Sequence, residues 1–410
     1  MTTVLKFGGT SLATPDKIRS AAEVVIRAAA DGAVAVVVSA MGSTTDELLS
    51  LGEQLGATVP SRETDRLLAT GELVSAAGLA ITLTALGCPA RSLSGEQAGI
   101  AVDGPPSEGR ITHVEPAGIL ACFERGEVAV IAGFQGIDRN GELRTLGRGG
   151  SDTTAVAIAA ALGVPDCLIY TDVAGVHSAD PRVVKTARVR PSLPRKVMAE
   201  MSFAGAKVMH ARAVELAEAR NIAIHLRSAG ESTAAGSIIG AATSMPGLED
   251  LGPTAVAHDL DVARVLIKAP THQQRLAIEV LGIYGRHVAP IDLVARSGQG
   301  ESEFRMGFTM RDQDVARLHD ELADLVAAAG GELLIDRAVA KVSLVGHGLG
   351  SRPAIVARML ELLGREGVPT SWISSTPMRV SVVVPQDRAG DIVRVLHDEF
   401  ELHLAETPGG

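Results

Sequence analysis

Residues 145–154, TLGRGGSDTT, join a glycine-rich turn to an apolar helical run that continues to Leu162. Ser151 or Asp152 is predicted to cap that helix, and the glycines allow backbone N–H groups to approach a ligand closely. A helix N-terminus favours negative charge, and Arg148 adds a planar fork that suits a carboxylate or a phosphate. The stretch therefore predicts an anion site, with an ordinary glycine-rich turn before a helix as the alternative.

The composition is that of a globular chain with an aliphatic core and an acidic balance. A chain of 410 residues suffices for about two or three domains. Hydrophobic residues make up 46% of the chain but aromatic residues only 2%, so the core must consist of Ala, Val, Leu and Ile. A net charge of −10 without a basic cluster argues against a nucleic-acid or membrane-surface protein. Small molecules are the expected partners.

The three cysteines are widely spaced and form no CxxC pair. Cys88, Cys122 and Cys167 are therefore predicted to be small buried hydrophobes, and to form neither a disulfide framework nor a metal site. No signal or transit peptide is apparent, and we expect no apolar run of membrane-spanning length. We expect a cytoplasmic protein with neither a membrane nor a nucleic acid as partner.

The first part of the chain alternates between buried strands and helices. A β-rich run over Thr2–Phe7 stops at paired glycines, and the continuous apolar run Ala33–Val38 is typical of a strand buried on both faces. Such alternation implies a mostly parallel sheet with helices on both faces, whose strand carboxyl ends bind ligands. The pattern further predicts helices over residues 14–30, 45–54, 62–86, 155–162 and 206–220, and strands over 128–132, 167–170 and 222–226.

An internal repeat occupies the C-terminal part of the chain. Val262–Ile267 resembles Val339–Leu344, and each run is followed by a predicted helix, an extended run, another strand and a helix ending in Leu-His-Asp-Glu. Two βαββα units of this kind usually bind a ligand or pair with each other. We divide the chain into a first domain of residues 1–240, a linker of residues 241–255, and repeat units of residues 256–335 and 336–410.

Lys6 lies at the end of the first predicted strand and is followed by Phe7 and the paired glycines Gly8 and Gly9. The motif is neither a Walker A loop nor a dinucleotide fingerprint, because the glycine spacing differs from both. A strand-end lysine beside backbone donors would nevertheless suit a transferring phosphoryl group. For Lys6 alone, a solvated lysine at the end of a strand is the alternative.

Glu72 lies inside a predicted helix next to a glycine, where it could receive an ammonium group. A solvated glutamate on a helix face is the alternative for this residue. Ser39 follows the second buried strand, and Thr44 and Thr45 lie at a predicted helix start, where capping alone would explain their hydroxyls.

Eight motifs in this order resemble the aspartate kinases of the amino-acid kinase family. They are KFGGTS at 6–11, SAMGSTTDEL at 39–48, LLATGE at 67–72, GFQG at 133–136, TLGRGGSDTTAVAIAAALG at 145–163, YTDV at 170–173, ADPR at 179–182 and GAKVMHARAVELA at 205–217. The C-terminal repeat is similar to the paired ACT domains of that family, so the resemblance covers nearly the whole chain.

The resemblance implies an α/β fold with a three-layer αβα, carbamate-kinase-like domain and two ferredoxin-like ACT domains. It also implies ATP-dependent phosphorylation of the β-carboxylate of L-aspartate to 4-phospho-L-aspartate, the first step of the aspartate-family pathway to lysine and threonine. No general base is needed, because the attacking carboxylate is ionised at neutral pH. Mg²⁺ is expected as a phosphate-bridging ion, kept largely by water and phosphate oxygens. A homo-oligomer, dimer or higher, formed through the ACT domains and an amino-acid effector bound there are further expectations.

The resemblance also assigns roles to individual residues. Lys6 is expected to contact the transferring phosphoryl group, Glu72 the substrate amino group and Arg148 a substrate carboxylate. The expected catalytic residues are Lys6, Arg148 and Asp152. The expected substrate-binding residues are Ser39, Thr44, Thr45, Glu72, Arg148, Gly149, Gly150 and Ser151. The expected nucleotide-binding residues are Lys6, Phe7, Gly8, Gly9, Ser11, Ser151, Thr171, Asp172, Val176, His177, Asp180, Pro181, Arg182 and Lys207.

The chain departs from the family pattern at several positions. Ala174, His177 and Arg144 stand where most members have Asp, Tyr and Thr. In the ACT region, Ala295-Arg296 replaces a Gln-Asn pair, residues 374–377 read SSTP in place of STSE, and a usual Pro-Gly is missing near His272-Gln273. These departures predict weakened feedback inhibition by lysine and threonine. A kinase for another amino-acid carboxylate or a carbamate-like anion, and an inactive amino-acid sensor, are the alternative functions.

Overall fold

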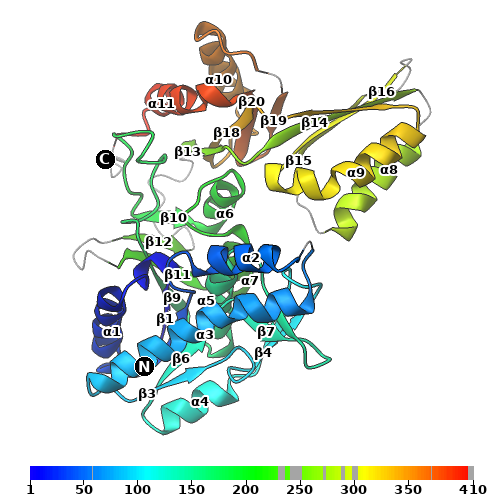
Figure 1. Ribbon diagram of the computed structural model, residues 1–410. Helices are drawn as coiled ribbons and strands as arrows, with labels where there is room; N and C mark the ends of the chain where they lie inside the picture. The colour runs from blue at the N-terminus through cyan, green and yellow to red at the C-terminus, as the bar shows by residue number, and fades with distance from the viewer. Residues whose placement is uncertain are drawn as a thin grey trace. The chain divides into compact units, whose positions relative to one another are not determined.

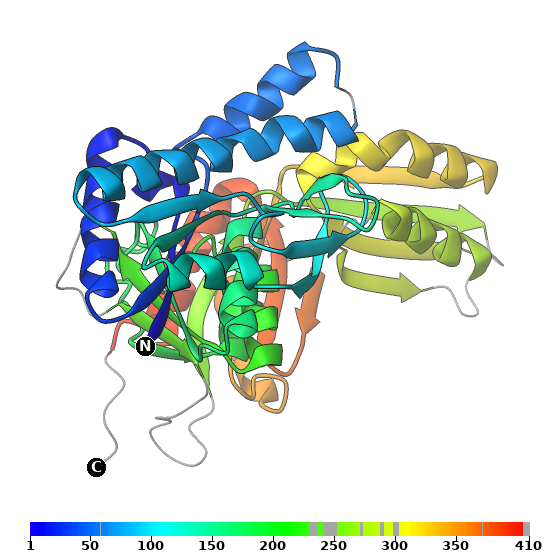
Figure 2. The same cartoon turned by 90° about the horizontal axis from the view of Figure 1, so that it is seen from below.

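A computed structural model shows two compact units (Figures 1 and 2). Unit 1 comprises Met1–Val176, Val189–Phe203 and Lys207–Met245, and unit 2 comprises His177–Arg188, Ala204–Ala206 and Pro246–Gly410. The structure describes residues 1–57, 59–229, 236–240, 252–270, 274–287, 291–297, 303–370 and 372–404. Residues 241–251, most of the predicted linker, lie outside this set.

Unit 1 is built on an eight-stranded sheet, in which β12 runs antiparallel to β11 and the other pairs are parallel. Its central strands are continuous apolar runs because both faces are covered. The spatial order of its strands is β10 (Ser192–Pro194), β12 (Ser237–Gly240), β11 (Ala223–Ser228), β9 (Asp166–Thr171), β1 (Thr2–Phe7), β2 (Ala33–Val38), β6 (Val128–Ala132) and β3 (Ala90–Leu93).

Helices cover the two faces of this sheet, as predicted. Val36 and Val38 of β2 belong to one hydrophobic cluster with α1 and α3, whereas the alternate residue Val37 lies on the side of α5. Thr14 caps α1 and accepts a hydrogen bond from the Lys17 N–H. The helices are α1 (Pro15–Ala29), α2 (Thr44–Gln54), α3 (Arg62–Ala85), α4 (Ala117–Glu124), α5 (Gly150–Ala161), α6 (Arg195–Phe203) and α7 (Ala211–Arg220).

The structure of unit 1 contains elements that the sequence pattern did not predict. Helix α6 was missed, and α7 begins at Ala211, five residues later than expected. A small second sheet has the strand order β5-β4-β7-β8, and its strand β8 directly precedes the glycine-rich turn. Its strands were missed because each has only three to five residues: β4 (Ile100–Asp103), β5 (Arg110–Val114), β7 (Gln135–Ile137) and β8 (Leu143–Thr145).

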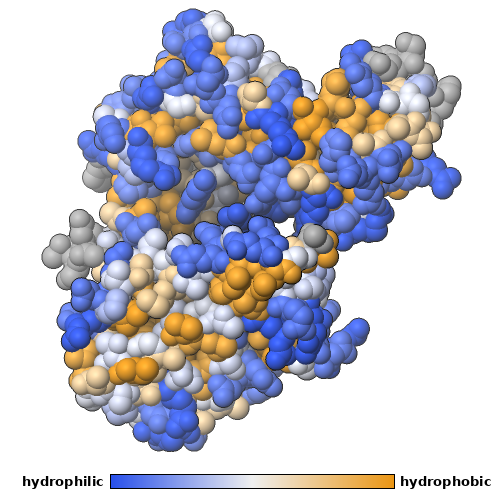
Figure 3. Space-filling model, viewed as in Figure 1, coloured by the Kyte–Doolittle hydropathy of each residue, from blue (hydrophilic) through white to orange (hydrophobic). Residues whose placement is uncertain are grey.

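Helix α3 corrects the expectation that no apolar run reaches membrane-spanning length. It has 24 residues and, by length and composition alone, is apolar enough to cross a membrane, but half of its most apolar window is buried inside the protein. Asp65 and Glu72 on this helix are buried, and both accept hydrogen bonds from other segments of unit 1. Val74 and Ile81 are exposed, and apolar patches of this kind are visible in Figure 3. These contacts are those of a core helix.

Unit 2 contains two antiparallel four-stranded sheets, as two ACT domains require. The first has the order β15-β16-β14-β17 and the second β13-β18-β20-β19. The elements are β13 (Pro253–Asp259), β14 (Ala263–Pro270), α8 (Gln274–Arg286), β15 (Asp292–Ser297), β16 (Glu303–Met310), α9 (Asp312–Ala328), β17 (Glu332–Asp336), β18 (Val339–Gly346), α10 (Pro353–Arg365), β19 (Trp372–Ser375), β20 (Arg379–Pro385) and α11 (Ala389–Glu399).

The chain order and the sheets of unit 2 do not coincide. Strand β13 pairs with β18 of the second repeat, so the remaining helices and strands of the first repeat, β14 to β17, lie between two paired strands in the chain. The first repeat also gains a strand, β17, that the βαββα pattern did not include. Each repeat thereby completes a four-stranded sheet.

Residues 177–188 also belong to unit 2, although they follow a strand of unit 1. Ala179 and Val184 join the hydrophobic core that contains Val342 and Leu344. The Ser178 carbonyl accepts a hydrogen bond from the Val256 N–H of β13 at 2.8 Å. The burial of two apolar side chains therefore anchors this loop to the second sheet.

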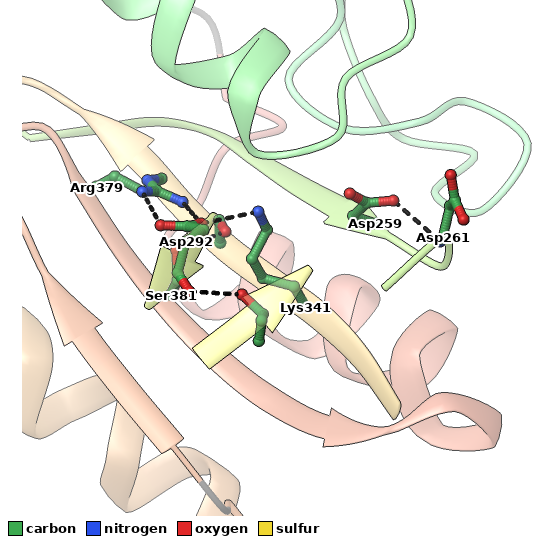
Figure 4. A network of polar contacts seen from close by, with 8 residues as sticks. Asp259, Asp261, Asp292, Lys341, Arg379 and Ser381 are labelled. Carbon is green, nitrogen blue, oxygen red and sulfur yellow. Dashed lines mark hydrogen bonds and ion pairs between the residues drawn. The ribbon is translucent and has the colours of Figure 1, made fainter. Parts of the chain in front are cut away.

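The two sheets of unit 2 meet through a buried ion network (Figure 4). The Asp292 carboxylate on β15 lies 3.0 Å from the Lys341 Nζ on β18 and 2.9 Å from an Arg379 nitrogen on β20. Lys341 and Arg379 are buried. Burial alone would raise the pKa of Asp292, but the hydrogen bond from Arg379 and the charge of Lys341 hold it well below its ordinary value.

Replacing Asp292→Asn should lower the free energy of unfolding of unit 2 by about 3 kcal/mol, because two buried cations lose their common carboxylate. Because folding lowers the pKa of Asp292, its ion pairs stabilise unit 2 fully at pH values above the pKa of an unfolded aspartate. This stabilisation is lost as the pH falls from that value toward the lower pKa of the folded state. Chemical denaturation at neutral pH measures the change. Asp336→Asn, which removes a more exposed partner of Arg264, is the control and should cost less than about 1 kcal/mol. Equal losses in both variants would contradict this account.

Candidate active site

A buried ion pair joins the end of β1 to the start of α5. The Lys6 Nζ lies 2.6 Å from a carboxylate oxygen of Asp152, and only 7% of Lys6 is exposed. The alternative of a solvated strand-end lysine is therefore wrong. Because Asp152 lies in the first turn of α5, the pair places a fixed ammonium group beside a helix N-terminus.

The paired glycines allow the turn after β1 to pack tightly against its neighbours. The Gly8 N–H donates to the Tyr170 carbonyl at 3.1 Å. A Cβ on Gly9 would lie 2.6 Å from the Ala40 carbonyl oxygen, so no larger residue fits there. The Ser11 hydroxyl is buried without a hydrogen-bond partner among the described residues. A ligand oxygen in this turn would satisfy that hydroxyl.

Glu72 projects from α3 to the loop after β2 and is 3% exposed, which excludes a solvated helix-face position. One carboxylate oxygen accepts a hydrogen bond from the Ala40 N–H at 3.0 Å, and the other has no hydrogen-bond partner among the described residues. Burial raises the Glu72 pKa to about 7, against the opposing effects of that hydrogen bond and the Lys6 charge. The adjacent Gly71 permits this approach, since a Cβ there would lie 2.8 Å from the Ala40 side chain.

The N-terminus of α5 differs from the prediction. The N-cap residue is Gly149, with φ at 70°, and no side chain of the described residues caps the helix. Ser151 and Asp152 lie in its first turn, so neither is the cap. A Cβ on Gly149 would lie 2.1 Å from the His210 Cβ, which explains the glycine sterically. Without a side-chain cap, the first-turn N–H groups can bind an anion.

The loop that carries the exposed Arg148 is held in place by Asp65 and Arg212, for which the sequence predicted no role. The buried Asp65 carboxylate accepts hydrogen bonds from the Thr145 hydroxyl at 2.6 Å and the Ser107 N–H at 2.8 Å. Burial raises the pKa of Asp65 despite these hydrogen bonds. Arg212 donates to the Leu146 carbonyl. Asp65 lies in the charged stretch 61–66, SRETDR, so no local sequence pattern indicated its burial or its role.

The remaining predicted substrate residues lie around this centre. Ser39 directly follows β2, and its N–H donates to the Phe7 carbonyl at 3.1 Å. Thr44 is the first residue of α2, and Thr45 is the second. The Thr44 methyl group lies near Gly71 of α3. Ser151 packs against Gly133, where a Cβ would lie 2.9 Å from the serine side chain.

The predicted nucleotide residues are divided between the units. Thr171, Asp172, Val176 and Lys207 belong to unit 1, whereas residues 177–182 belong to unit 2. The Thr171 hydroxyl donates to Asp172 at 3.1 Å. Within unit 2, Arg182 donates three hydrogen bonds to the two oxygens of Asp180, which lowers the Asp180 pKa. Arg144, a departure from the family pattern, binds Asp138 in its own hairpin at 2.9 Å.

Other predicted features have defined positions too. Cys122 and Cys167 are buried and Cys88 is half-buried, and all three are free thiols. Residues 272–273, one of the noted departures, lie outside the described set. Among the described residues, the group of three side chains suited to a metal lies far along the chain, at His397, Asp398 and His403.

Glu72→Gln should make unit 1 more stable above neutral pH. An acid whose pKa rises from 4.5 to about 7 on folding loses stability as the pH increases between those values. The loss is at most about 3 kcal/mol, and the amide avoids it. Urea denaturation between pH 5 and pH 8 measures the effect, with the exposed Glu47→Gln as control. An unchanged pH dependence in Glu72→Gln would show that Glu72 is not the group responsible.

Family comparisons agree with this architecture. Residues 1–228 match the amino acid kinase family, and residues 342–400 match an ACT domain. An aspartokinase from Thermus thermophilus is 38% identical over 405 residues, covering 98% of this chain and 99% of the relative. An aspartokinase from Mycobacterium tuberculosis is 39% identical over 404 residues, covering 97% and 96%.

A solved structure has the same fold along the whole chain. Escherichia coli aspartokinase III, in complex with aspartate and ADP, superposes with a TM-score of 0.81 at 23% identity, covering 98% of this chain and 100% of that one. Its identity is low enough that it supports the fold alone. Together with relatives that match almost from end to end, these findings show that the chain belongs to the aspartokinase family of amino acid kinases.

Proposed function

We propose that this aspartokinase transfers the γ-phosphoryl group of ATP to the β-carboxylate of L-aspartate. A carboxylate oxygen forms a bond to the γ-phosphorus as the bond to the bridging oxygen breaks, giving 4-phospho-L-aspartate and ADP. The observation that carries this proposal is the buried Lys6 and Glu72, with the partly buried Asp152 paired to Lys6 in the first turn of α5. The nucleophile is already ionised, so positioning and charge stabilisation are the required contributions.

The charges of the site suit a zwitterion with a second carboxylate. The free oxygen of Glu72 can accept a hydrogen bond from a substrate ammonium group, which would restore the ionised carboxylate. Arg148, held in its loop through Asp65 and Thr145, can bind a substrate carboxylate with its fork. Ser39, Thr44, Thr45 and the backbone of Gly149 and Gly150 complete the proposed substrate contacts.

Lys6 is proposed to stabilise the phosphoryl group during transfer. Asp152 holds its ammonium group at the N-terminus of α5, whose first-turn N–H groups provide further positive potential. Phe7, Gly8, Gly9, Ser11 and Ser151 line this position in the proposal. Mg²⁺ would supply charge neutralisation on the phosphates, and oxygen ligands from phosphate and water suit this ion.

The nucleotide is proposed to bind Thr171, Asp172, Val176 and Lys207 of unit 1, and His177, Asp180, Pro181 and Arg182 of unit 2. Support comes from the motif resemblance and, within unit 2, from the hydrogen bonds that order Asp180 and Arg182. A homo-oligomer formed through the ACT domains, an amino-acid effector bound there, and a cytoplasmic location complete the proposal. The rival substrates are other amino-acid carboxylates, and the rival function is an inactive sensor.

A substrate panel tests the proposed activity. L-aspartate should support ADP release, while L-glutamate and N-acetylglutamate should not. L-glutamate has a longer side chain than aspartate, and N-acetylglutamate also lacks a free ammonium group. Lys6→Ala should lower kcat by about 100- to 1,000-fold, the loss typical of one donor to developing charge. The exposed Lys196→Ala is the matched control. Turnover with another acid but not aspartate would overturn the substrate assignment, and full activity of Lys6→Ala would overturn the role of Lys6.

Lysine and threonine at millimolar concentration should leave the activity nearly unchanged. Ala295 and Arg296 on β15 offer a methyl group and a cation where feedback-regulated relatives offer two amides, and residues 374–377 have lost a glutamate. The double variant Ala295→Gln, Arg296→Asn should gain sensitivity if these amides are what is missing. Strong combined inhibition of the unaltered protein would contradict the proposal of weakened feedback.

A further inference from the structure

The end of α11 brings together three side chains with metal-binding atoms. A ring nitrogen of His397, a ring nitrogen of His403 and a carboxylate oxygen of Asp398 all lie within 4.8 Å of one another. His397 Nδ1 lies 3.8 Å from the Asp398 oxygen. We propose that these residues form a site for a divalent first-row transition metal such as Zn²⁺, separate from the substrate site.

The helix terminus explains how the three residues meet. The Leu402 N–H donates to the His397 carbonyl at 3.0 Å and the Glu401 N–H donates to the Asp398 carbonyl at 3.0 Å, which is a Schellman motif. Glu401 has a φ of 54°, a conformation that non-glycine residues rarely adopt. The buried Leu402 anchors the reversed chain. The reversal brings the His403 ring to within 6.2 Å of the His397 ring, centroid to centroid.

The environment of each imidazole suits metal ligation. His397 is fully buried, and its Nε2 lies 2.9 Å from the Ser178 hydroxyl oxygen. A metal on Nδ1 would fix the tautomer in which Nε2–H donates to Ser178, the usual partner arrangement of a ligating histidine. The Ser178 oxygen also accepts from the Arg188 N–H at 3.1 Å. His403 Nδ1 is buried without a hydrogen-bond partner among the described residues.

The donor set points to a particular class of ion. Two imidazoles and one carboxylate suit Zn²⁺, Co²⁺ or Ni²⁺, whereas Mg²⁺ and Ca²⁺ require oxygen ligands. Ligand atoms about 2.1 Å from a tetrahedral Zn²⁺ stand about 3.4 Å apart, so atoms that lie within 4.8 Å of one another must approach by at most about 1.4 Å, a small side-chain adjustment. The Asp398 side chain is exposed, which leaves a path from solvent and room for water as a further ligand.

Coupling to the rest of unit 2 follows from Ser178. Ser178 lies two residues before Asp180, in the loop after β9. Its hydrogen bond with Arg188 joins the two ends of the segment 178–188, and its hydrogen bond with His397 ties that segment to α11. A metal that orients the His397 ring would therefore also order the loop after β9. The rival explanation is a structural histidine bonded to Ser178, with Asp398 and His403 beside it by chance.

Metal titration of the full-length, tag-free protein distinguishes the two. After treatment with a chelator, the protein should bind one equivalent of Zn²⁺ in competition with a metal indicator, and Co²⁺ should show the visible absorption of a low-symmetry site. His403→Ala should abolish this binding, and Ser178→Ala should weaken it by about ten- to a hundredfold. Circular dichroism of each variant checks that it is folded.

His319→Ala is the matched control, because His319 Nδ1 lies 3.0 Å from the adjacent Asp320 on an exposed helix face without belonging to the three-residue group. It should bind Zn²⁺ as the unaltered protein does. Two results would overturn the proposal: equal Zn²⁺ affinity in the unaltered protein and His403→Ala, or loss of the bound equivalent in His319→Ala. Both readouts are independent of kinase activity.

Discussion

An ammonium group and two carboxylates share a region of unit 1 from which most water is excluded. Lys6 pairs with Asp152 at 2.6 Å, while Glu72 remains close enough for the Lys6 charge to lower its pKa. Burying such groups costs free energy unless each charge has a partner. One of the two Glu72 carboxylate oxygens has no hydrogen-bond partner among the described residues. Burial therefore disfavours the charged form of Glu72 and raises its pKa. This unpaired oxygen supports our proposal that a ligand brings positive charge to Glu72.

The surrounding fold maintains this arrangement through close backbone contacts. Gly9, Gly71 and Gly149 each lie where a Cβ would collide with a neighbouring segment. Gly9 and Gly71 let the turn after β1 and helix α3 approach Ala40 closely, and Gly149 lets the start of α5 approach His210. Asp65 then fixes the Arg148 loop through Thr145, eighty residues away in sequence. Burying Glu72 lowers the free energy of unfolding of the unliganded protein, and ligand binding beside Glu72 would recover that free energy.

The sequence predicted the parallel sheet and the two repeats, because buried strands and repeated apolar runs leave strong local patterns. It could not establish the burial of Glu72 or the role of Asp65, which depend on contacts between distant segments. It misplaced the cap of α5, since Gly149 adopts a left-handed conformation against His210. It also could not assign residues 177–188, whose burial of Ala179 and Val184 places them with unit 2.

The central claim is that Glu72 becomes ionised when a substrate ammonium group binds beside it. Isothermal titration of L-aspartate near pH 7, in buffers of different ionisation enthalpy, measures the protons released on binding. Glu72 is about half protonated at its pKa, so we predict release of about half a proton per substrate bound, and none in Glu72→Gln. A binding enthalpy independent of the buffer would contradict the claim.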